Sequence, residues 1–226
     1  MVNEVHVGVI DSGCTAQQAG HLAGGRRFWL EQGMLCEGEL QADSLGHGTA
    51  VLARLLKQTD GVAVSMAQVF DSRGATSVLQ VSAALLWLVE QGVTLVNLSL
   101  GLAQDRPVLR QACAQAQDAG VLLCASSPAR GAPVYPASYP GVLRITGDAR
   151  LREGQWSWLN TVQADFGAAV GERDGPAGAS LACATFSGQL CAYWRMHPGA
   201  SRDQLIAHLR EQAAFVGPER RGGEHG

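Results

Sequence analysis

Short runs rich in β-branched residues alternate along this chain with longer apolar segments of helical length, and this alternation restricts the fold more than any other feature. The short runs are five expected strands, at Glu4–Ile10, Val64–Phe70, Thr94–Leu98, Val121–Ala125 and Val142–Thr146. The longer segments are expected helices, at Gly48–Lys57, Ser77–Gln91, Leu109–Ala119, Ser180–Trp194 and Ser201–Gln212. Such alternation is typical of an α/β fold with a mostly parallel, buried sheet. Ser77–Gln91 is apolar nearly all round, so we expect it to lie between other elements.

Length and composition fit one globular protein. The 226 residues predict a single domain, residues 1–216, followed by a tail rich in glycine and charge, residues 217–226. Hydrophobic residues make up 46% of the chain and charged residues 16%, which excludes a globally disordered protein. The 17 Lys and Arg residues against 20 Asp and Glu residues give a net charge of −3. Proteins that bind nucleic acid or an anionic membrane carry a positive excess, so neither partner is expected.

Two features of the sequence predict a cytoplasmic protein. There is no apolar run of roughly 18 residues or more, which excludes a transmembrane helix, and the first residues do not resemble a secretory signal. The cysteines form no CxxC pair and have no zinc-like spacing with histidine. We therefore expect buried free thiols at Cys14, Cys36, Cys113, Cys124, Cys183 and Cys191. No cofactor and no metal site are predicted.

Three polar residues lie where an open parallel sheet gathers catalytic groups. Asp11 ends the first expected strand, His47 lies between two glycines where a helix begins, and Ser180 begins another helix. Strand ends and helix starts of this kind can converge at one edge of the sheet. A serine hydroxyl is a poor nucleophile until a neutral imidazole removes its proton, and the imidazole needs a carboxylate to fix its tautomer. Together the three residue types predict a catalytic triad.

Taken one at a time, these signals are weak. A strand-end aspartate before Ser-Gly is most often a turn or cap residue, a histidine between glycines is only suggestive, and Gly-x-Ser is common. Their order strengthens them, because Asp, His, Ser is one of the few orders known for this triad. The start of a helix at Ser180 would also offer backbone N–H groups and a positive dipole end to an oxyanion.

Five motifs in this order resemble the subtilisin-like serine protease family, the subtilases. They span about residues 5 to 197 and comprise Val-Ile-Asp-Ser-Gly at Asp11, Gly-His-Gly-Thr-Ala-Val at His47, Val96–Gly101, Tyr135–Pro140 and Gly178–Ala182. The resemblance implies a three-layer subtilisin-like fold with helices on both faces of the sheet. It also implies that Ser180 is the nucleophile, His47 the general base and then general acid, and Asp11 the orienting carboxylate.

The same resemblance implies where substrate binds. An extended polypeptide would add a strand against Ser99, Leu100 and Gly101, with backbone pairing providing affinity. Leu100, Ala125 and Ser126 would line the first specificity pocket. The alternative is that these three residues belong to the core.

The chain departs from the family at the oxyanion hole. Family members usually carry an asparagine after the fifth strand whose amide donates to the oxyanion, and Ser127 stands at that position here. Loss of this donor in a subtilisin costs about 10²–10³ in rate. We expect Ser127, directly or through a water, and the backbone N–H of Ser180 to form the oxyanion hole of a slow enzyme; the alternative is an inactive one. Trimmed loops without a calcium-type acidic cluster predict no structural calcium.

Three functions remain open at this point. The one we favour is a selective processing endopeptidase, similar to small intracellular subtilases that remove leader peptides from modified ribosomal peptides. One such group matures the small subunit of quinohemoprotein amine dehydrogenase, and a peptide-modifying enzyme would then be a partner. The alternatives are general intracellular peptide turnover and a protein that binds an extended peptide in the same groove without cutting it.

Overall fold

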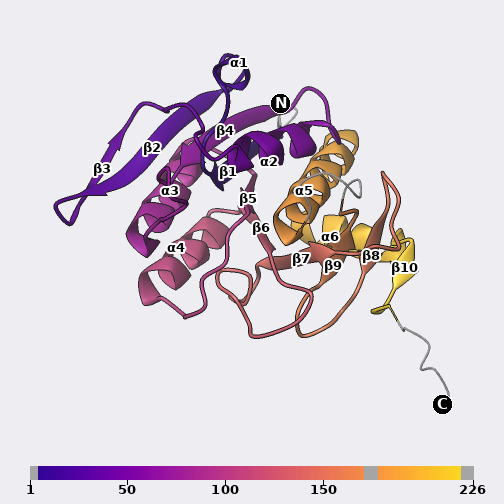
Figure 1. Ribbon diagram of the computed structural model, residues 1–226. Helices are drawn as coiled ribbons and strands as arrows, with labels where there is room; N and C mark the ends of the chain where they lie inside the picture. Colours follow the sequence, from indigo (N-terminus) through magenta and orange to yellow (C-terminus); the bar gives the residue numbers. More distant parts are fainter. Residues whose placement is uncertain (1–4, 171–177, 220–226) are drawn as a thin grey trace.

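The computed structural model describes residues 5–170 and 178–219, and in this part of the chain ten strands form one sheet (Figure 1). The strands are β1 (His6–Asp11), β2 (Gly24–Glu31), β3 (Met34–Gly38), β4 (Ala63–Gln68), β5 (Leu95–Leu98), β6 (Leu122–Ser126), β7 (Leu143–Gly147), β8 (Trp156–Trp158), β9 (Phe166–Ala168) and β10 (Phe215–Val216). Their order is β10-β8-β9-β7-β6-β5-β1-β4-β2-β3. Neighbours are parallel except β2 with β3 and β8 with β9. The predicted mostly parallel sheet is confirmed.

Helices cover both faces of this sheet. They are α1 (Ala16–Ala19), α2 (His47–Leu56), α3 (Val78–Glu90), α4 (Pro107–Asp118), α5 (Ala179–Met196) and α6 (Arg202–Glu211). Val7 and Val9 of β1 belong to a buried cluster with α2, α5 and α6, whereas Ile10 belongs to a second cluster with α3 and α4. Because side chains alternate across a strand, β1 contributes to both cores. The predicted three-layer α/β fold is confirmed, and none of the described helices is long and apolar enough to cross a membrane.

The five expected strands correspond to β1, β4, β5, β6 and β7, and the five expected helices to α2 through α6, with ends that differ by at most two residues. The helix expected at Ser77–Gln91 is α3, which packs against both β2 and α4 as its apolar surface predicts. It begins with a capping box between Ser77 and Gln80. Glu4 and residues 220–226 of the expected tail lie outside the described residues.

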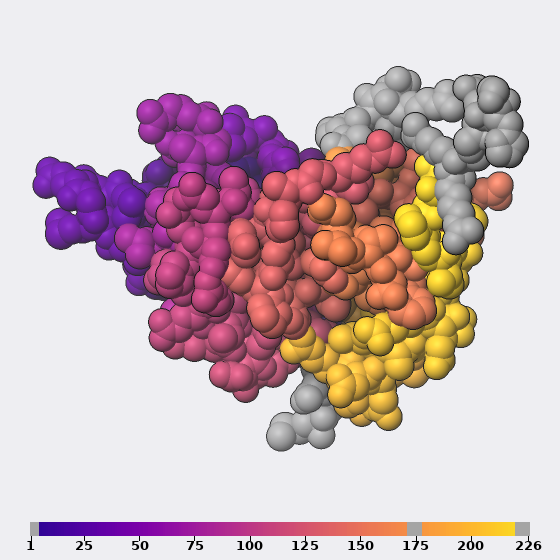
Figure 2. All heavy atoms as spheres, turned by 90° about the horizontal axis from the view of Figure 1, so that it is seen from below, coloured from indigo at the N-terminus to yellow at the C-terminus, as the bar shows by residue number. Residues whose placement is uncertain are grey.

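The structure adds a hairpin that the sequence did not predict. β2 and β3 pair antiparallel, with Leu30 opposite Leu35, and form an arm at the indigo end of the molecule (Figure 2). This arm was missed because Arg26, Arg27 and Glu31 interrupt its apolar pattern. β8, β9 and β10 were missed because they are only two or three residues long.

The expectation of buried thiols is confirmed for five of the six cysteines and is wrong for Cys36, which lies on the edge strand β3. All six are free, and five of them are buried, Cys36 being the partly exposed one. Burial raises the pKa of Cys113 and of Cys124 to about 12. At neutral pH these side chains are therefore uncharged and pack as small apolar groups.

Candidate active site

The candidate site lies at the edge of the sheet where β1, β5 and β6 end. These parallel strands are neighbours, so their carboxyl ends bring Asp11, Ser99 and Ser126 to one edge. α2 and α5 begin at the same edge, with His47 hydrogen-bonded to Asp11 and Ser180 hydrogen-bonded to Ser99. The topology therefore gathers the three predicted triad residues at one edge of the sheet, as expected for an open parallel sheet.

Asp11, the last residue of β1, is fully buried. Its Oδ1 accepts hydrogen bonds from the backbone N–H of Ser12 and from Nδ1 of His47, both at 2.7 Å. Its Oδ2 is buried and has no hydrogen-bond partner among the described residues. A carboxylate in this position fixes the imidazole tautomer with the proton on Nδ1, which leaves Nε2 as the basic nitrogen.

His47 is the first residue of α2, and the chain reaches it through Gly46, whose φ of 71° favours glycine. The side chain is 43% exposed, so one side of the ring remains open to a substrate. The hydrogen bond to Asp11 raises the pKa of His47 above the ordinary histidine value of 6.5; burial opposes this, and the charges of Asp11 and Asp43 add to it. A histidine with these features is suited to accept and return a proton near neutral pH.

Ser180 lies in the first turn of α5, after Gly178 with a φ of 134°. Its hydroxyl donates to the backbone carbonyl of Ser99 at 3.3 Å, and the Ser99 hydroxyl donates to the carbonyl of Ser180 at 3.3 Å. The described residues show no hydrogen bond between Ser180 and His47. The structure thus links Asp11 to His47 and Ser180 to Ser99, and the serine hydroxyl has to leave Ser99 before it can meet the imidazole.

A buried polar network that sequence reasoning missed contacts Ser99. The Ser187 hydroxyl, on α5, donates to Oδ1 of Asn97 at 3.0 Å, and Nδ2 of Asn97 donates to the Ser99 hydroxyl at 2.9 Å. Asn97 and Ser187 are both 0% exposed. The network fixes β5 against α5 and so positions Ser99 relative to Ser180. An asparagine inside an otherwise apolar strand was the available sequence signal.

Ser127, the residue predicted for the oxyanion hole, follows β6 and is buried. Its hydroxyl donates to the backbone carbonyl of Gln163 at 2.6 Å. A serine hydroxyl carries one proton, so in this arrangement Ser127 has none left to donate to an oxyanion. The contact counts against a direct role for Ser127. The backbone N–H of Ser180 lies in the first turn of α5, where amide groups lack intrahelical acceptors.

The residues predicted to contact substrate lie beside this edge. Ser99 and Leu100 are buried and Gly101 is exposed. Ala125 and Ser126 end β6 and are buried, and the apolar cluster on the α3 and α4 face includes Leu100 and Ala125. Leu100 and Ala125 therefore lie in the core, as the alternative interpretation expected. Their place in a specificity pocket stays a prediction.

Sequence reasoning also missed Asp43. It lies in the loop before α2, and its Oδ1 accepts from the Ser12 hydroxyl and from the backbone N–H of Gly46, both at 2.9 Å. Its Oδ2 accepts from the backbone N–H and the hydroxyl of Thr49, at 2.8 and 2.7 Å. Burial alone would raise the pKa of Asp43, but these hydrogen bonds outweigh it and lower the pKa. Asp43 is therefore ionised at neutral pH close to His47.

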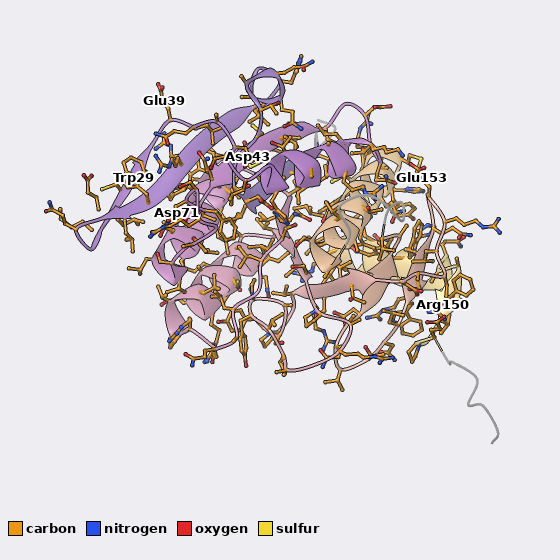
Figure 3. All side chains as sticks on the ribbon, viewed as in Figure 1. Trp29, Glu39, Asp43, Asp71, Arg150 and Glu153 are labelled. Carbon is orange, nitrogen blue, oxygen red and sulfur yellow. The ribbon has the colours of Figure 1, made fainter. Side chains whose placement is uncertain are left out.

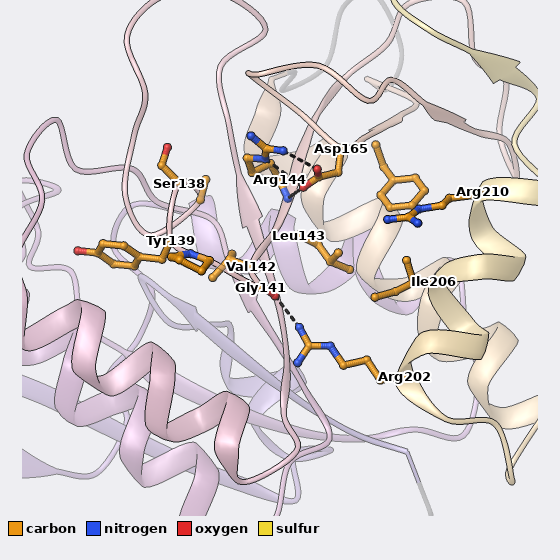
Figure 4. Close-up of a pocket in the computed structure, with 13 residues that line it drawn as sticks. Ser138, Tyr139, Gly141, Val142, Leu143, Arg144, Asp165, Arg202, Ile206 and Arg210 are labelled. Carbon is orange, nitrogen blue, oxygen red and sulfur yellow. Dashed lines mark hydrogen bonds and ion pairs between the residues drawn. The ribbon is translucent and has the colours of Figure 1, made fainter.

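A cavity of about 430 Å³ lies away from this edge, at the amino end of β7 (Figure 4). It is bordered by α6 and by the loop before β7. Arg144 forms an ion pair with Asp165 at 2.6 Å, and Arg202 donates to the Gly141 carbonyl at 2.6 Å. The first contact joins β7 to the residue before β9, and the second joins α6 to the loop before β7. Asp11, His47 and Ser180 do not line this cavity.

Metal ligation is not visible in the described part of the chain, where no three His, Cys, Asp or Glu side chains converge on one point. The absence of calcium and of other cofactors stays a prediction.

Comparison with known proteins gives concordant results. The sequence model of the Peptidase S8 family, the subtilases, matches residues 3–147. This range contains Asp11, His47 and Ser99 and ends before Ser180. The chain is 31% identical to Subtilisin Savinase of Lederbergia lenta over 153 residues, which cover 62% of this chain and 54% of that protein. It is 29% identical to the Thermostable alkaline protease of Halalkalibacterium halodurans over 154 residues, 63% of this chain and 41% of that protein.

The chain thus spans about half the length of these curated relatives. Among solved structures, one described as "Crystal Structure of a Lanthipeptide Protease" superposes with a TM-score of 0.71, covering 95% of this chain and 81% of that one. The two sequences are 18% identical, so this likeness concerns the fold.

Proposed function

Because this chain belongs to the subtilase family, we propose that it is a serine endopeptidase that cuts a polypeptide through an acyl-enzyme, with Asp11, His47 and Ser180 as its triad. The observation that carries the proposal is the hydrogen bond of 2.7 Å between His47 Nδ1 and the buried Asp11, at the sheet edge where Ser180 begins α5. A buried carboxylate on Nδ1 leaves Nε2 to act as the base.

In the proposed reaction, His47 Nε2 removes the proton of Ser180 Oγ, which attacks the scissile carbonyl carbon. The resulting imidazolium gives its proton to the leaving amine as the C–N bond breaks, and the acyl group stays on Ser180 as an ester. His47 then deprotonates a water that attacks the ester, which releases the acid and restores the Ser180 hydroxyl. Asp11 keeps the ring oriented and stabilises its charged form throughout.

The proposed enzyme is slow. The backbone N–H of Ser180 is its main oxyanion donor, because the Ser127 hydroxyl is hydrogen-bonded to Gln163. Absence of one of two donors costs on the order of 10²–10³ in rate. A slow enzyme is adequate for a substrate present in limited amount and held along the Ser99–Gly101 strand, where backbone pairing gives affinity.

Among endopeptidase activities we favour selective processing, in which the enzyme removes a leader peptide from a modified polypeptide in the cytoplasm. The enzyme that modifies the polypeptide would then be a partner. The weak oxyanion hole supports selective cleavage, because a slow enzyme cuts best those substrates that stay bound along the Ser99–Gly101 strand. The superposed lanthipeptide protease shows that the same fold occurs in an enzyme named for a modified peptide. A precursor such as the small subunit of quinohemoprotein amine dehydrogenase is a candidate substrate on the basis of the sequence resemblance.

A second candidate function is peptide binding without cleavage. The observation that favours it is the hydrogen bond from the Ser180 hydroxyl to the Ser99 carbonyl, which directs the nucleophile away from His47.

A library of internally quenched octapeptides separates these functions, with Ser180→Ala as the control. Cleavage of a few related sequences that disappears in the variant supports selective processing. Cleavage of most sequences indicates general peptide turnover. Binding without cleavage, measured by fluorescence anisotropy with a labelled peptide, indicates the second candidate and overturns the endopeptidase proposal.

A further inference from the structure

In the described part of the chain, Ser12 connects Asp11 and Asp43, the two carboxylates whose charges act on His47. Its backbone N–H donates to Oδ1 of Asp11 at 2.7 Å, and its hydroxyl donates to Oδ1 of Asp43 at 2.9 Å. The same hydroxyl accepts from the backbone N–H of Gly48 at 2.8 Å. One side chain therefore joins the end of β1, the loop before α2 and the residue next to His47.

Asp43, which is labelled in Figure 3, lies at the other end of this connection. Its carboxylate accepts the backbone N–H groups of Gly46 and Thr49, on either side of His47. Amide groups in the first turn of a helix lack intrahelical acceptors, so a carboxylate here both satisfies them and complements the helix dipole. Gly46 offers no side chain to cap α2, and Asp43 performs that task from three residues earlier.

Among the described residues, the charges that act on His47 are those of two carboxylates. Asp11 ends β1 and Asp43 precedes α2, and both act on the imidazole. α5 packs against α2 but carries a single charged residue, Arg195, near its far end. A change in the charge at Asp43 is therefore transmitted to His47 without compensation from the facing helix.

We propose that Asp43 is a positioning residue for His47: it holds the imidazole against Asp11 through Ser12 and the first turn of α2, and it supplies a second negative charge beside the ring. This inference rests on the proposed function in taking His47 as the base. Asp43 itself touches neither the substrate nor a reacting atom in this account.

The test uses Asp43→Asn, which keeps the size of the side chain and removes its charge, in the full chain. One readout is the pKa of His47, followed by NMR titration of its ring C–H signal, which is assigned by its loss in His47→Gln. The second readout is the pH profile of labelling by a fluorophosphonate. We expect the His47 pKa to fall and the acid limb of the profile to move to lower pH with it. On the alkaline plateau the labelling rate is expected to fall on the order of 10-fold to 10²-fold, the cost of a displaced catalytic group.

The matched control is Asp148→Asn. Asp148 is also a loop carboxylate that accepts a serine hydroxyl, from Ser157 at 2.7 Å, and a backbone N–H, but its ion pair is with Arg150, far from Asp43 in Figure 3. This variant should leave the His47 pKa and the acid limb in place. If Asp43→Asn does not fold, Asp43→Ser takes its place, because serine can still cap α2 but carries no charge. The same fall in the His47 pKa and the same shift of the acid limb are then expected.

Failure of this inference and failure of the proposed function give different results in these experiments. A wild-type chain that is never labelled contradicts the proposed function, while the NMR titration still tests Asp43. A wild-type chain that is labelled, together with an Asp43→Asn variant whose His47 pKa, acid limb and plateau rate all match it, overturns the inference. A uniform fall in rate at every pH with an unmoved pKa also overturns it, because that is the effect of general destabilisation.

Discussion

The hydroxyl of Ser180 donates to the backbone carbonyl of Ser99 at 3.3 Å, and the hydroxyl of Ser99 donates to the carbonyl of Ser180 in return. The proposed nucleophile is thus held by the strand along which substrate is expected to pair. A substrate N–H that donates to the Ser99 carbonyl takes over the acceptor now used by Ser180. In the proposed mechanism this exchange frees the hydroxyl to turn toward His47, so substrate binding and activation of the serine are linked.

The network behind Ser99 predicts a stability effect. Asn97→Ala leaves the Ser187 hydroxyl without its acceptor and the Ser99 hydroxyl without its donor, and both serines are buried. We expect the free energy of unfolding to fall by about 2–3 kcal/mol, measured by urea denaturation. The control is Ser44→Ala at an exposed position, with a change of less than about 0.5 kcal/mol. An unchanged urea midpoint in Asn97→Ala would show that the network does not hold β5 to α5.

Ser127→Ala tests the oxyanion hole. Because the Ser127 hydroxyl donates to the Gln163 carbonyl, its removal is expected to change the rate of fluorophosphonate labelling by less than about 3-fold, against the loss of about 10²–10³ that accompanies removal of a true oxyanion donor. A large loss with an intact fold, verified by circular dichroism, would return Ser127 to the oxyanion hole and show that its hydroxyl turns during the reaction.

The pH dependence follows from His47. The hydrogen bond to Asp11 raises the pKa of His47, and the base must be neutral to remove the Ser180 proton. Labelling is therefore expected to fall as pH drops, with a midpoint above 6.5. The free energy of unfolding has the opposite pH dependence. Because the pKa of His47 is raised in the folded state, this residue adds stability below its unfolded-state pKa, and that stability is lost as pH rises through the folded-state pKa. A midpoint below 6.5 in the pH profile of labelling would contradict this account.

The backbone at Gly48 packs closely against the backbone at Gly13, and this contact positions His47. A Cβ added to Gly48 would lie 2.2 Å from the carbonyl oxygen of Gly13 and 2.9 Å from its nitrogen, and backbone atoms cannot move aside cheaply. We expect Gly48→Ala to lower the free energy of unfolding by about 1–3 kcal/mol and to slow labelling by displacing His47. Gly199→Ala is the control, since nothing lies near its added Cβ. Equal urea midpoints for the two variants would refute this packing argument.

Much of the fold could be predicted because its central strands are short, buried and mostly apolar. β1, β5 and β6 show as apolar runs, and Asp11 and His47 lie in local motifs next to such elements. The β2–β3 arm could not be found in this way, because its charged, half-exposed residues resemble a loop. Strands of two or three residues, such as β10, carry too little pattern to identify.

Part of the candidate site could likewise be predicted from the sequence, and part could not. Identities and order of the triad are local properties of the sequence, whereas the partners of its members depend on distant packing. Asn97 meets Ser187, which is 90 residues away, and Ser127 meets Gln163, which is 36 residues away. Neither contact could be anticipated from spacing, and the second changes the expected role of Ser127.

Intact-mass analysis after incubation with a fluorophosphonate, which reacts with an activated serine, tests whether the triad works. We predict a single adduct on the wild-type chain, absent from Ser180→Ala and strongly reduced in His47→Ala. We also predict that fragmentation places the adduct on Ser180. A wild-type chain that stays unmodified after long incubation, or an adduct that persists in Ser180→Ala, would contradict the claim that Asp11, His47 and Ser180 assemble into a working triad.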